Sequence, residues 1–214
     1  MKLYTYFRSS AAYRVRIALS LKGIGYQSIP IHLVKNGGEQ HSEAYKALNP
    51  AELVPAIEAE GEILRQSIAI IEYLDEVYPE PSLIPGSALE RSRIRAFSQD
   101  IACDIHPLNN LRVLQYLERN LNCDAASKTA WYHHWLGMGF QALEKTLESS
   151  SEGSGFCFGD TPTMADCCLV PQVYNALRFD FDVSGFRNIM RVYERCMEVE
   201  AFMNASPESQ SDSQ

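Results

Sequence analysis

Two adjacent serines offer the first chemistry in this sequence. Ser9 and Ser10 follow a run of apolar and aromatic residues, 2–7, that predicts a strand, and they precede an apolar helical pattern over 11–19. The first turn of a helix presents free backbone N–H groups and a positive dipole end, which favour an anion. A thiolate bound there would have a lowered pKa. The alternative is that one serine only caps the helix.

A proline marks a second candidate segment. Pro55 stands where a predicted strand begins, and a residue without an N–H fits only an edge, a strand start or a cis turn. A cis Val54-Pro55 bond would turn the amide and carbonyl of Val54 outward, free to pair with an extended peptide ligand. An ordinary trans bond at a strand start is the alternative.

Gln66 and Ser67 form the third candidate, because they lead a second helical pattern that carries Ile71, Leu74 and Tyr78 on one face. A hydroxyl and an amide beside the free N–H groups of a helix start suit an α-carboxylate. Taken alone, Ser67 is an ordinary helix cap.

The elements that carry these residues follow from hydrophobic periodicity and turn signals. Residues 1–80 predict alternating strands and helices, and Glu60-Gly61 separates two short apolar runs as the turn of a β-hairpin does. The predicted order is a strand over 2–7, a helix over 11–19, a strand over 26–31, a loop with at most a short helix over 35–47, a hairpin over 54–65 and a helix from Ser67.

Prolines and a change of pattern predict a linker over 81–88 and an all-helical domain over 89–206. Its helices are expected at about 88–120, 124–149, 163–180 and 184–205, with a loop over 149–155. Thr163 and Asp166 have the spacing of a capping box, which is a structural feature. The tail 207–214 lacks large apolar residues, so we expect it to be flexible.

Composition limits the possible functions. The chain has 214 residues, is 46% hydrophobic and has a net charge of -8, which is typical of globular proteins and opposes nucleic-acid binding. It contains neither a membrane-spanning run nor a signal peptide, so we expect a soluble cytoplasmic protein. Its six cysteines form no CxxC pair and no metal-ligand spacing, so no metal site is predicted.

Taken together, the motifs resemble those of the glutathione transferases, and of the zeta class in particular, over residues 1 to about 207. That class includes maleylacetoacetate isomerase and maleylpyruvate isomerase. The motifs are Ser9-Ser10 with Arg14-Val15-Arg16-Ile17-Ala18-Leu19, Leu48-Asn49-Pro50 with Val54-Pro55, Gln66-Ser67 with Ala69-Ile70-Ile71-Glu72-Tyr73-Leu74, and Thr163-Met164-Ala165-Asp166 with Leu169-Val170-Pro171-Gln172-Val173. The resemblance implies a thioredoxin-like N-terminal domain that binds glutathione, followed by an all-helical substrate-binding domain, in a homodimer.

The resemblance also implies roles for individual residues. The implied catalytic residues are Arg8, Ser9, Ser10 and Arg178. The implied glutathione contacts come from Ser9, Ser10, Gln40, Val54, Gln66, Ser67, His106 and Asn110. The implied substrate contacts come from Arg8, His106, Asn109, Arg112 and Arg178. Ala11 departs from the family pattern, which usually has Cys there, and no Cys occurs before Cys103, so any thiol nucleophile must come from the ligand.

The residues that follow His106 are expected to form a helix. In a helix after Pro107, Asn109 and Arg112 would share a face, with His106 at the start, and these residues could line a cleft between the domains. For Arg112 and Arg178, a surface salt bridge is the alternative.

The implied activity is glutathione-dependent cis-trans isomerisation of maleylacetoacetate-type dicarboxylic keto acids, in aromatic amino-acid catabolism. A thiolate that adds to the conjugated C=C makes that bond single, so it can rotate before the sulfur leaves. Three alternatives stay open: a maleylpyruvate isomerase, a transferase that conjugates glutathione to electrophiles such as α-haloacids, and a thioredoxin-like adaptor without activity.

Overall fold

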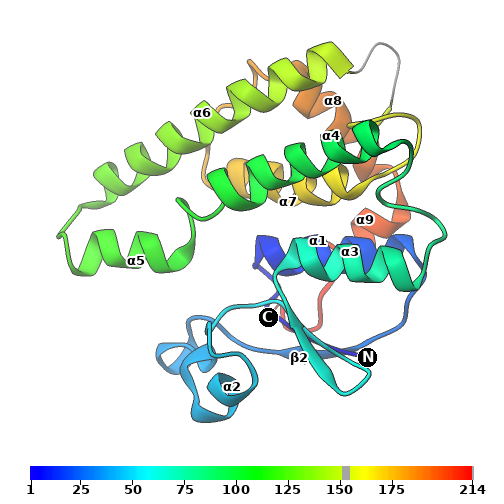
Figure 1. Cartoon of the computed structure of the whole chain (residues 1–214). Helices are drawn as coiled ribbons and strands as arrows, with labels where there is room; N and C mark the ends of the chain where they lie inside the picture. The colour runs from blue at the N-terminus through cyan, green and yellow to red at the C-terminus, as the bar shows by residue number, and fades with distance from the viewer. Residues whose placement is uncertain (151–154, 214) are drawn as a thin grey trace. The chain divides into compact units, whose positions relative to one another are not determined.

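The computed structural model describes residues 1–150 and 155–213, and these form two compact units (Figure 1). The first unit contains Met1–Ile84 and Met197–Gln214, and the second contains Pro85–Cys196. Most of the loop expected over 149–155 lies outside the described residues, because only residues 149, 150 and 155 belong to them. No helix within the described residues combines the length and apolar character that crossing a membrane requires.

The first unit is built on a four-stranded sheet with strand order β2-β1-β3-β4. Strand β1 pairs with β2 in parallel and with β3 antiparallel, and β3 pairs antiparallel with β4. The strands are β1 (Lys2–Thr5), β2 (Gln27–Pro30), β3 (Ala56–Ala59) and β4 (Glu62–Arg65). The predicted hairpin is confirmed, and its turn residues Glu60 and Gly61 have φ of 53° and 84°, as a two-residue turn of that kind requires.

Helices α1 (Ser10–Leu21) and α3 (Ser67–Val77) lie side by side on one face of the sheet (Figure 1). Each begins after a strand of that sheet and buries an apolar side, with Val15 and Leu19 of α1 and Ile70 and Leu74 of α3 inaccessible to solvent. This arrangement is the thioredoxin-like fold that the resemblance implies. It places the start of each helix just after the end of a strand.

The polar stretch between β2 and β3 has the short helix that the sequence allowed, together with two further turns. It contains two 3-10 turns, Lys35–Gly37 and Glu39–His41, and the short helix α2 (Glu43–Leu48). Tyr45 of α2 is buried in a cluster with Tyr6, Phe7 and Val54. This cluster joins the segment before β3 to the segment after β1.

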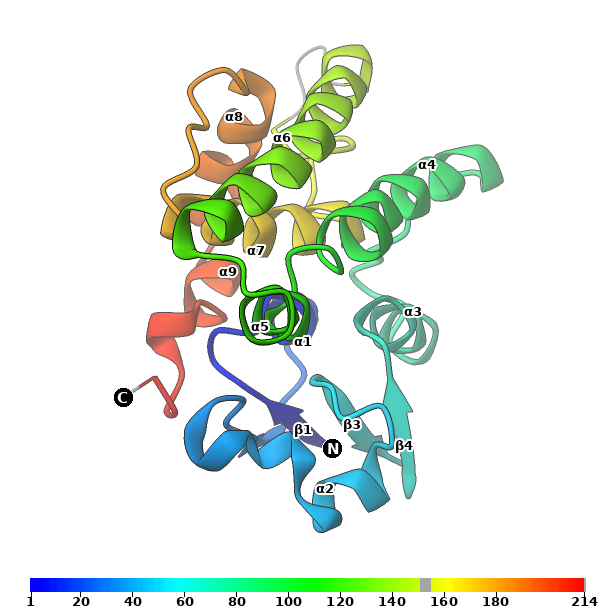
Figure 2. The same ribbon diagram turned by 90° about the vertical axis from the view of Figure 1, so that its left-hand side faces the viewer.

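The C-terminal residues differ from two expectations, that the all-helical domain extends over 89–206 and that the tail over 207–214 is flexible. Residues from Met197 belong to the first unit, and α9 (Glu200–Asn204) packs against α1 (Figure 2). The tail 207–214 was expected to be flexible, but Pro207–Ser209 forms a 3-10 helix and the Phe7 amide donates to the Asp212 carboxylate. The expectation failed because side-chain hydrogen bonds, which need no large apolar residue, order this segment.

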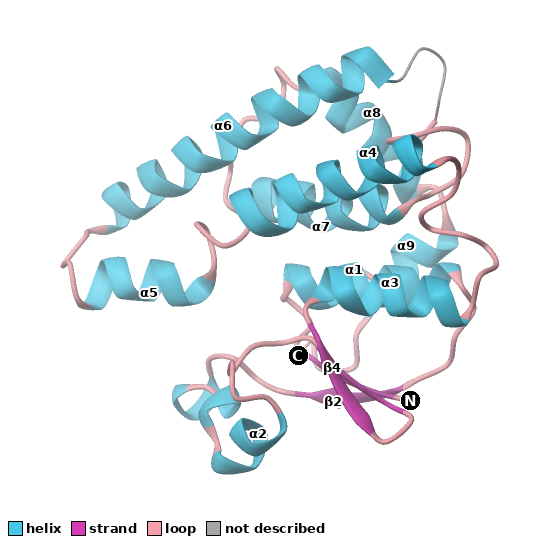
Figure 3. Cartoon of the chain, in the orientation of Figure 1, coloured by secondary structure: helices cyan, strands magenta, loops and turns pink. Residues whose placement is uncertain are grey.

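The described residues of the second unit are helices and loops (Figure 3). The helices are α4 (Ala88–Gln99), a π-helix (Asp100–Ile105), α5 (Leu111–Arg119), α6 (Ala125–Ser150), α7 (Met164–Arg178) and α8 (Arg187–Met197). The single helix expected over 88–120 is wrong, because a turn around Pro107 interrupts it. The helix expected over 184–205 is also two helices, α8 and α9.

Candidate active site

Three of the predicted segments meet at one end of the sheet. The strand register places Tyr4 of β1 opposite Ala56 of β3, and Ala56 opposite Arg65 of β4. Strands β1 and β4 therefore end where β3 begins. Because α1 follows β1 and α3 follows β4, both helices also start at this end of the sheet. The sequence alone could not supply this register.

At the start of α1, Ser9 occupies the N-cap position and is half-buried. Its Oγ accepts a hydrogen bond of 3.2 Å from the Ala12 amide, which leaves its O–H able to donate. Ser10 is the first residue of the helix and is buried. Arg8 is exposed, and its guanidinium lies 4.9 Å from the centre of the Phe7 ring. The helix carries no acidic residue in its first turn, so its positive end has no anion of its own.

Val54 lies just before the paired part of β3, and its peptide bond to Pro55 is cis. The preceding carbonyl, that of Leu53, accepts two hydrogen bonds of 2.7 Å, from the Tyr45 hydroxyl and the Asn49 amide nitrogen. These bonds fix the segment that enters Val54. The question of cis or trans, which the sequence left open, is settled in favour of the cis bond.

The start of α3 differs in detail from the prediction. Gln66, and not Ser67, occupies the N-cap position, and its side chain makes no capping bond to a described residue. Gln66 is exposed and has φ 69° and ψ 116°, a conformation that residues other than glycine rarely adopt and that is typical of ligand-binding sites. Ser67 is buried, and its Oγ accepts a hydrogen bond of 3.2 Å from Nη1 of Arg14.

Gln40 is buried, and its neighbour His41 contacts Glu52, two residues before Val54. Its Nε2 donates to the Leu33 carbonyl at 3.4 Å, and its Oε1 is buried with no hydrogen-bond partner among the described residues. The adjacent His41 contacts the Glu52 carboxylate, and this hydrogen bond lowers the pKa of Glu52. The Gln40 oxygen is therefore an acceptor that a ligand N–H could satisfy.

In the second unit, the predicted group around His106 lies in a turn and not in a helix. His106 follows the π-helix, and Asn110 caps α5 by accepting from the Arg112 amide at 3.1 Å. Asn109 is buried, and its Nδ2 donates to the Tyr132 carbonyl at 3.1 Å. The prediction that Asn109 and Arg112 share a helical face is thus wrong, because Pro107 delays the helix until Leu111.

His106 and Asn110 contact each other, and Arg112 lies at the surface. The Nε2 of His106 lies 3.4 Å from Nδ2 of Asn110, and both residues are half-buried. Arg112 is exposed. Because Asn109 is held by the Tyr132 carbonyl, its amide nitrogen serves the fold.

Arg178 ends α7 in an ordered position. Its Nε donates to Asn175 Oδ1 at 3.2 Å, and its guanidinium lies 4.7 Å from the centre of the Phe179 ring. Phe179 in turn stacks on Tyr132 at 4.2 Å between ring centres. Burial raises the pKa of the Tyr132 hydroxyl, and the charge of Arg178 opposes this shift. Arg178 is exposed, so its terminal nitrogens can reach a carboxylate.

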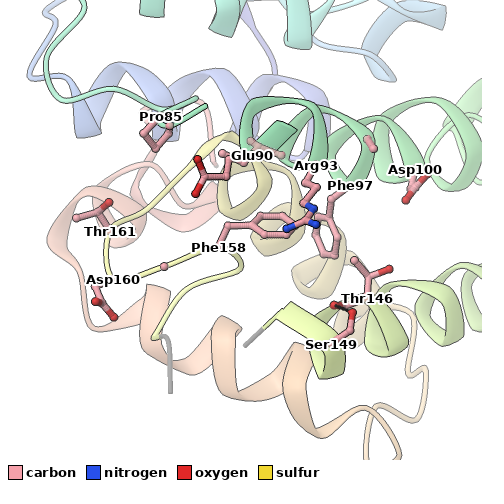
Figure 4. A pocket seen from close by; sticks show the side chains of 14 residues that line it. Pro85, Glu90, Arg93, Phe97, Asp100, Thr146, Ser149, Phe158, Asp160 and Thr161 are labelled. Carbon is pink, nitrogen blue, oxygen red and sulfur yellow. Dashed lines mark hydrogen bonds between the residues drawn. The ribbon is translucent and has the colours of Figure 1, made fainter. Parts of the chain in front are cut away.

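A cavity of about 820 Å³ opens elsewhere in the second unit, between α4, the end of α6 and the loop around Phe158 (Figure 4). Figure 4 shows Arg93, Phe97 and Phe158 gathered on one of its walls. None of the predicted catalytic, glutathione or substrate residues lines this cavity. The candidate active site is therefore not this cavity. It consists of the starts of α1 and α3 and the start of β3.

Sequence reasoning assigned no role to Arg14 and Arg16, which the structure places in the core of the first unit. Both are buried to 1% exposure in helix α1. Arg14 binds Ser67, and Arg16 donates to the carbonyls of Tyr6 and Phe7. Two arginines within an otherwise apolar helix were the available signal, because a buried guanidinium must have hydrogen-bond acceptors nearby.

Comparison with family models agrees with this fold. The model of the glutathione S-transferase N-terminal domain matches residues 3–82, and that of the C-terminal domain matches residues 129–199. The chain therefore belongs to the glutathione S-transferase family.

Individual relatives match nearly the whole chain. A probable maleylacetoacetate isomerase of Vibrio cholerae is 50% identical over 211 residues, which are 98% of this chain and 97% of that one. The holo structure of maleylpyruvate isomerase, described as a bacterial zeta-class glutathione S-transferase, has a TM-score of 0.97 at 46% identity, with both chains fully covered. A maleylacetoacetate isomerase of Methylobacterium extorquens, solved with bound malonate and glutathione, has a TM-score of 0.94 at 33% identity and full coverage of both chains. The zeta-class resemblance is confirmed.

Proposed function

We propose that this protein is a glutathione-dependent cis-trans isomerase of maleylacetoacetate-type dicarboxylic keto acids. The observation that carries the proposal is the meeting of two helix starts and one strand start at the same end of the sheet. This arrangement offers anion sites on either side of an extended backbone edge, which suits a peptide that carries both a thiolate and an α-carboxylate.

The residues at this end of the sheet fit glutathione. The Gln40 oxygen is buried without a partner among the described residues, and Gln66 holds a rare backbone conformation at the start of α3. Bound glutathione would supply a thiolate that adds reversibly to the C=C bond of the substrate, so that this bond becomes single, rotates and re-forms when the sulfur leaves.

Each residue of the first unit has a distinct part in this proposal. The hydroxyl of Ser9 donates a hydrogen bond to the sulfur, while its oxygen keeps the helix cap. The backbone of Val54 pairs with that of the tripeptide. Gln66 and Ser67, with the N–H groups of α3, hold the α-carboxylate. Ser10 supports the helix start from inside.

The cationic residues account for substrates with two carboxylates. We propose that Arg8 and Arg178 bind carboxylates and that His106, Asn110 and Arg112 contribute donors. Arg178 carries the strongest argument of these, because Phe179 and Asn175 hold it in place while its terminal nitrogens remain exposed. Asn109 donates from Nδ2 to the Tyr132 carbonyl, so it would contribute to a ligand only as an acceptor, through an Oδ1 that is buried with no hydrogen-bond partner among the described residues.

A turnover assay tests the proposal. The protein is incubated with maleylacetoacetate or maleylpyruvate and a small amount of glutathione, and the trans isomer and the free thiol are followed together. We expect many isomerisations for each glutathione, with the thiol conserved. Glutathione consumed one for one, without isomer, would replace the proposal by a transferase acting on electrophiles such as α-haloacids. Neither activity, with no retention on immobilised glutathione, would favour an adaptor.

The same assay separates the two isomerase substrates. The relatives include proteins named maleylacetoacetate isomerase and maleylpyruvate isomerase, at 50% and 46% identity. We propose maleylacetoacetate first, and a higher kcat/KM for maleylpyruvate would overturn that choice. By analogy with the family, we also propose a cytoplasmic homodimer that acts in aromatic amino-acid catabolism, and sedimentation of the full chain tests the dimer.

A further inference from the structure

The backbone of Phe7 is held by side chains from two distant parts of the first unit. Phe7 lies between β1 and Ser9, and its ring belongs to the buried cluster with Tyr45 and Val54. Its carbonyl accepts a hydrogen bond from Arg16, and its amide donates one to Asp212. Both backbone groups of one residue are thus fixed from outside the loop.

Arg16 supplies the first of these ties. Its Nη2 lies 3.0 Å from the Phe7 carbonyl oxygen, and its Nε lies 2.9 Å from the carbonyl oxygen of Ala205. A single buried guanidinium therefore binds the loop before Ser9 and the C-terminal segment together. That segment continues from α9 toward residue 213 (Figure 2).

Asp212 supplies the second tie, from the far end of that segment. Its Oδ2 accepts from the Phe7 amide at 3.0 Å, across 205 residues of sequence. Its Oδ1 is buried with no hydrogen-bond partner among the described residues. The segment before it is fixed by its own bonds, in which Gln210 Nε2 donates to the carbonyls of Asn204 and Ser206. The carboxylate is therefore presented from an ordered segment.

The charge of Asp212 also favours its position near Arg16. Burial lowers the pKa of Arg16 to about 10, and the charge of Asp212 is among the interactions that oppose this shift. An anion close to a buried cation stabilises the charged guanidinium, which in turn holds the carbonyls of Tyr6 and Phe7. The hydrogen bond from the Phe7 amide to Asp212 and the one from Arg16 to the Phe7 carbonyl thus stabilise each other.

The loop in question carries the proposed thiol site. Arg8 and Ser9 follow Phe7 directly, and the Ser9 amide donates to the Tyr6 carbonyl at 2.9 Å. A shift of the Phe7 peptide would therefore move the backbone from which the Ser9 hydroxyl and the Arg8 guanidinium project. Errors of about 1 Å in the position of a reacting group can cost about 100-fold in rate.

We infer that Asp212 is a positioning residue for the thiolate site, because it anchors the Phe7 amide and so sets the position of Ser9. This inference rests on the proposed function, since it concerns the same site. It assigns to the C-terminal tail a role in activating the bound thiol. The tail acts through the backbone of the loop and touches no reacting atom.

The test compares full-length variants in three measurements: the pKa of bound glutathione from the ultraviolet absorbance of its thiolate, kcat, and hydrogen exchange of the Phe7 amide. Asp212→Ala removes the acceptor. We expect faster exchange at Phe7, a raised thiol pKa and a fall in kcat of about 5-fold, the size of one lost positioning hydrogen bond.

Two further variants isolate the acceptor. Asp212→Asn keeps an oxygen that can accept from the Phe7 amide, so it should restore the thiol pKa and kcat to near wild-type values. Ser211→Ala alters an exposed neighbour and should match the wild type throughout. Should Asp212→Ala fail to fold, Asp212→Glu moves the acceptor while keeping the charge, and we expect the same losses from it.

The outcomes separate this inference from the proposed function. A wild-type protein that leaves the glutathione thiol pKa at its free value overturns the proposed function and this inference with it. A wild type that lowers that pKa, with Asp212→Ala equal to it in both pKa and kcat, overturns this inference alone. Equal losses in Asp212→Ala and Asp212→Asn would also overturn it, because the hydrogen-bond acceptor would then be irrelevant.

Discussion

Helices α1 and α7 both have a hydroxyl residue at the N-cap, Ser9 and Thr163, but only α7 has a carboxylate of the protein at its start. At the start of α7, the carboxylate of Asp166 is fully buried and accepts hydrogen bonds from the Thr163 amide, the Thr163 hydroxyl and the Cys157 amide, at 2.8 to 2.9 Å. At the start of α1, Ser9 is half-buried and accepts one hydrogen bond, from Ala12.

The difference lies in where the negative charge comes from. Helix α7 has its own anion in the first turn, Asp166, whose pKa is raised by burial and lowered in part by the three donors. Helix α1 has no acidic residue there, and neither does α3. A helix start with an internal carboxylate is satisfied and stabilises the fold. A helix start without one remains able to bind an anion from solution.

The largest effect should come from removing the internal anion. Asp166→Ala leaves three donors without their acceptor in a buried site, so we expect the free energy of unfolding to fall by about 4 kcal/mol. Denaturant unfolding of the full chain measures this. The kcat per folded molecule should not change, because Asp166 belongs to the cap of α7.

Asp182→Ala is the matched control for that variant. Asp182 is exposed and accepts one local hydrogen bond, from the Ser184 amide at 2.9 Å, so its loss should cost about 1 kcal/mol or less. Equal costs for the two variants would contradict the view that enclosure of the carboxylate distinguishes the start of α7.

The next effect tests the open helix start. Ser9→Ala removes the proposed donor to the sulfur, so we expect kcat to fall about 100-fold, the size seen when a donor to a developing or fixed anion is lost. It should also cost about 1 kcal/mol of stability, because Ser9 caps the helix. Ser10→Ala should affect turnover far less, since Ser10 is buried inside the first turn.

Ser42 provides the control for capping without catalysis. It caps α2 by accepting from the Tyr45 amide at 3.3 Å, and it is exposed. Ser42→Ala should lose a comparable amount of stability and keep its turnover. Small and equal losses of turnover in Ser9→Ala and Ser10→Ala would argue against activation of the thiol by a serine.

Much of this comparison could be predicted from the sequence. The capping pair Thr163 and Asp166, the hairpin turn at Glu60 and the helix start at Ser9 all follow from local residue patterns, and the structure has each of them. Such features depend on a few neighbouring residues, so one sequence suffices to find them.

Features that depend on distant residues were not predictable. The tail was expected to be flexible because it lacks apolar side chains, yet Asp212 binds the backbone of Phe7. Asn109 was expected on a helical face, but Pro107 places it in a turn where it binds the Tyr132 carbonyl. A polar residue far along the chain can order a segment, and periodicity contains no signal for it.

A third effect concerns the cation that the second unit would provide. Arg178→Ala should raise the KM for a dicarboxylate about 10-fold, because a hydrogen-bonded ion pair with a carboxylate is lost. The KM for a neutral electrophile should change little. Arg91→Ala, an exposed arginine of α4, is the control. The same change in KM for both substrates would remove Arg178 from the substrate site.

The smallest effect should be the change in glutathione affinity caused by a substitution at the start of α3. Ser67 is buried, and its oxygen accepts a hydrogen bond from Arg14 at 3.2 Å, as a structural residue would. However, it lies at a helix start that has no acidic residue, and such a position suits the carboxylate of a ligand. Ser67→Ala should raise the Kd for glutathione about 5-fold, as one hydrogen bond is lost. Ser98 is a control, because it is also buried and donates to the Ile94 carbonyl of its own helix at 2.7 Å. Calorimetric titration with glutathione should show no change for Ser98→Ala. If the two variants bind glutathione equally well, Ser67 serves only to hold Arg14, and the start of α3 resembles that of α7 more than that of α1.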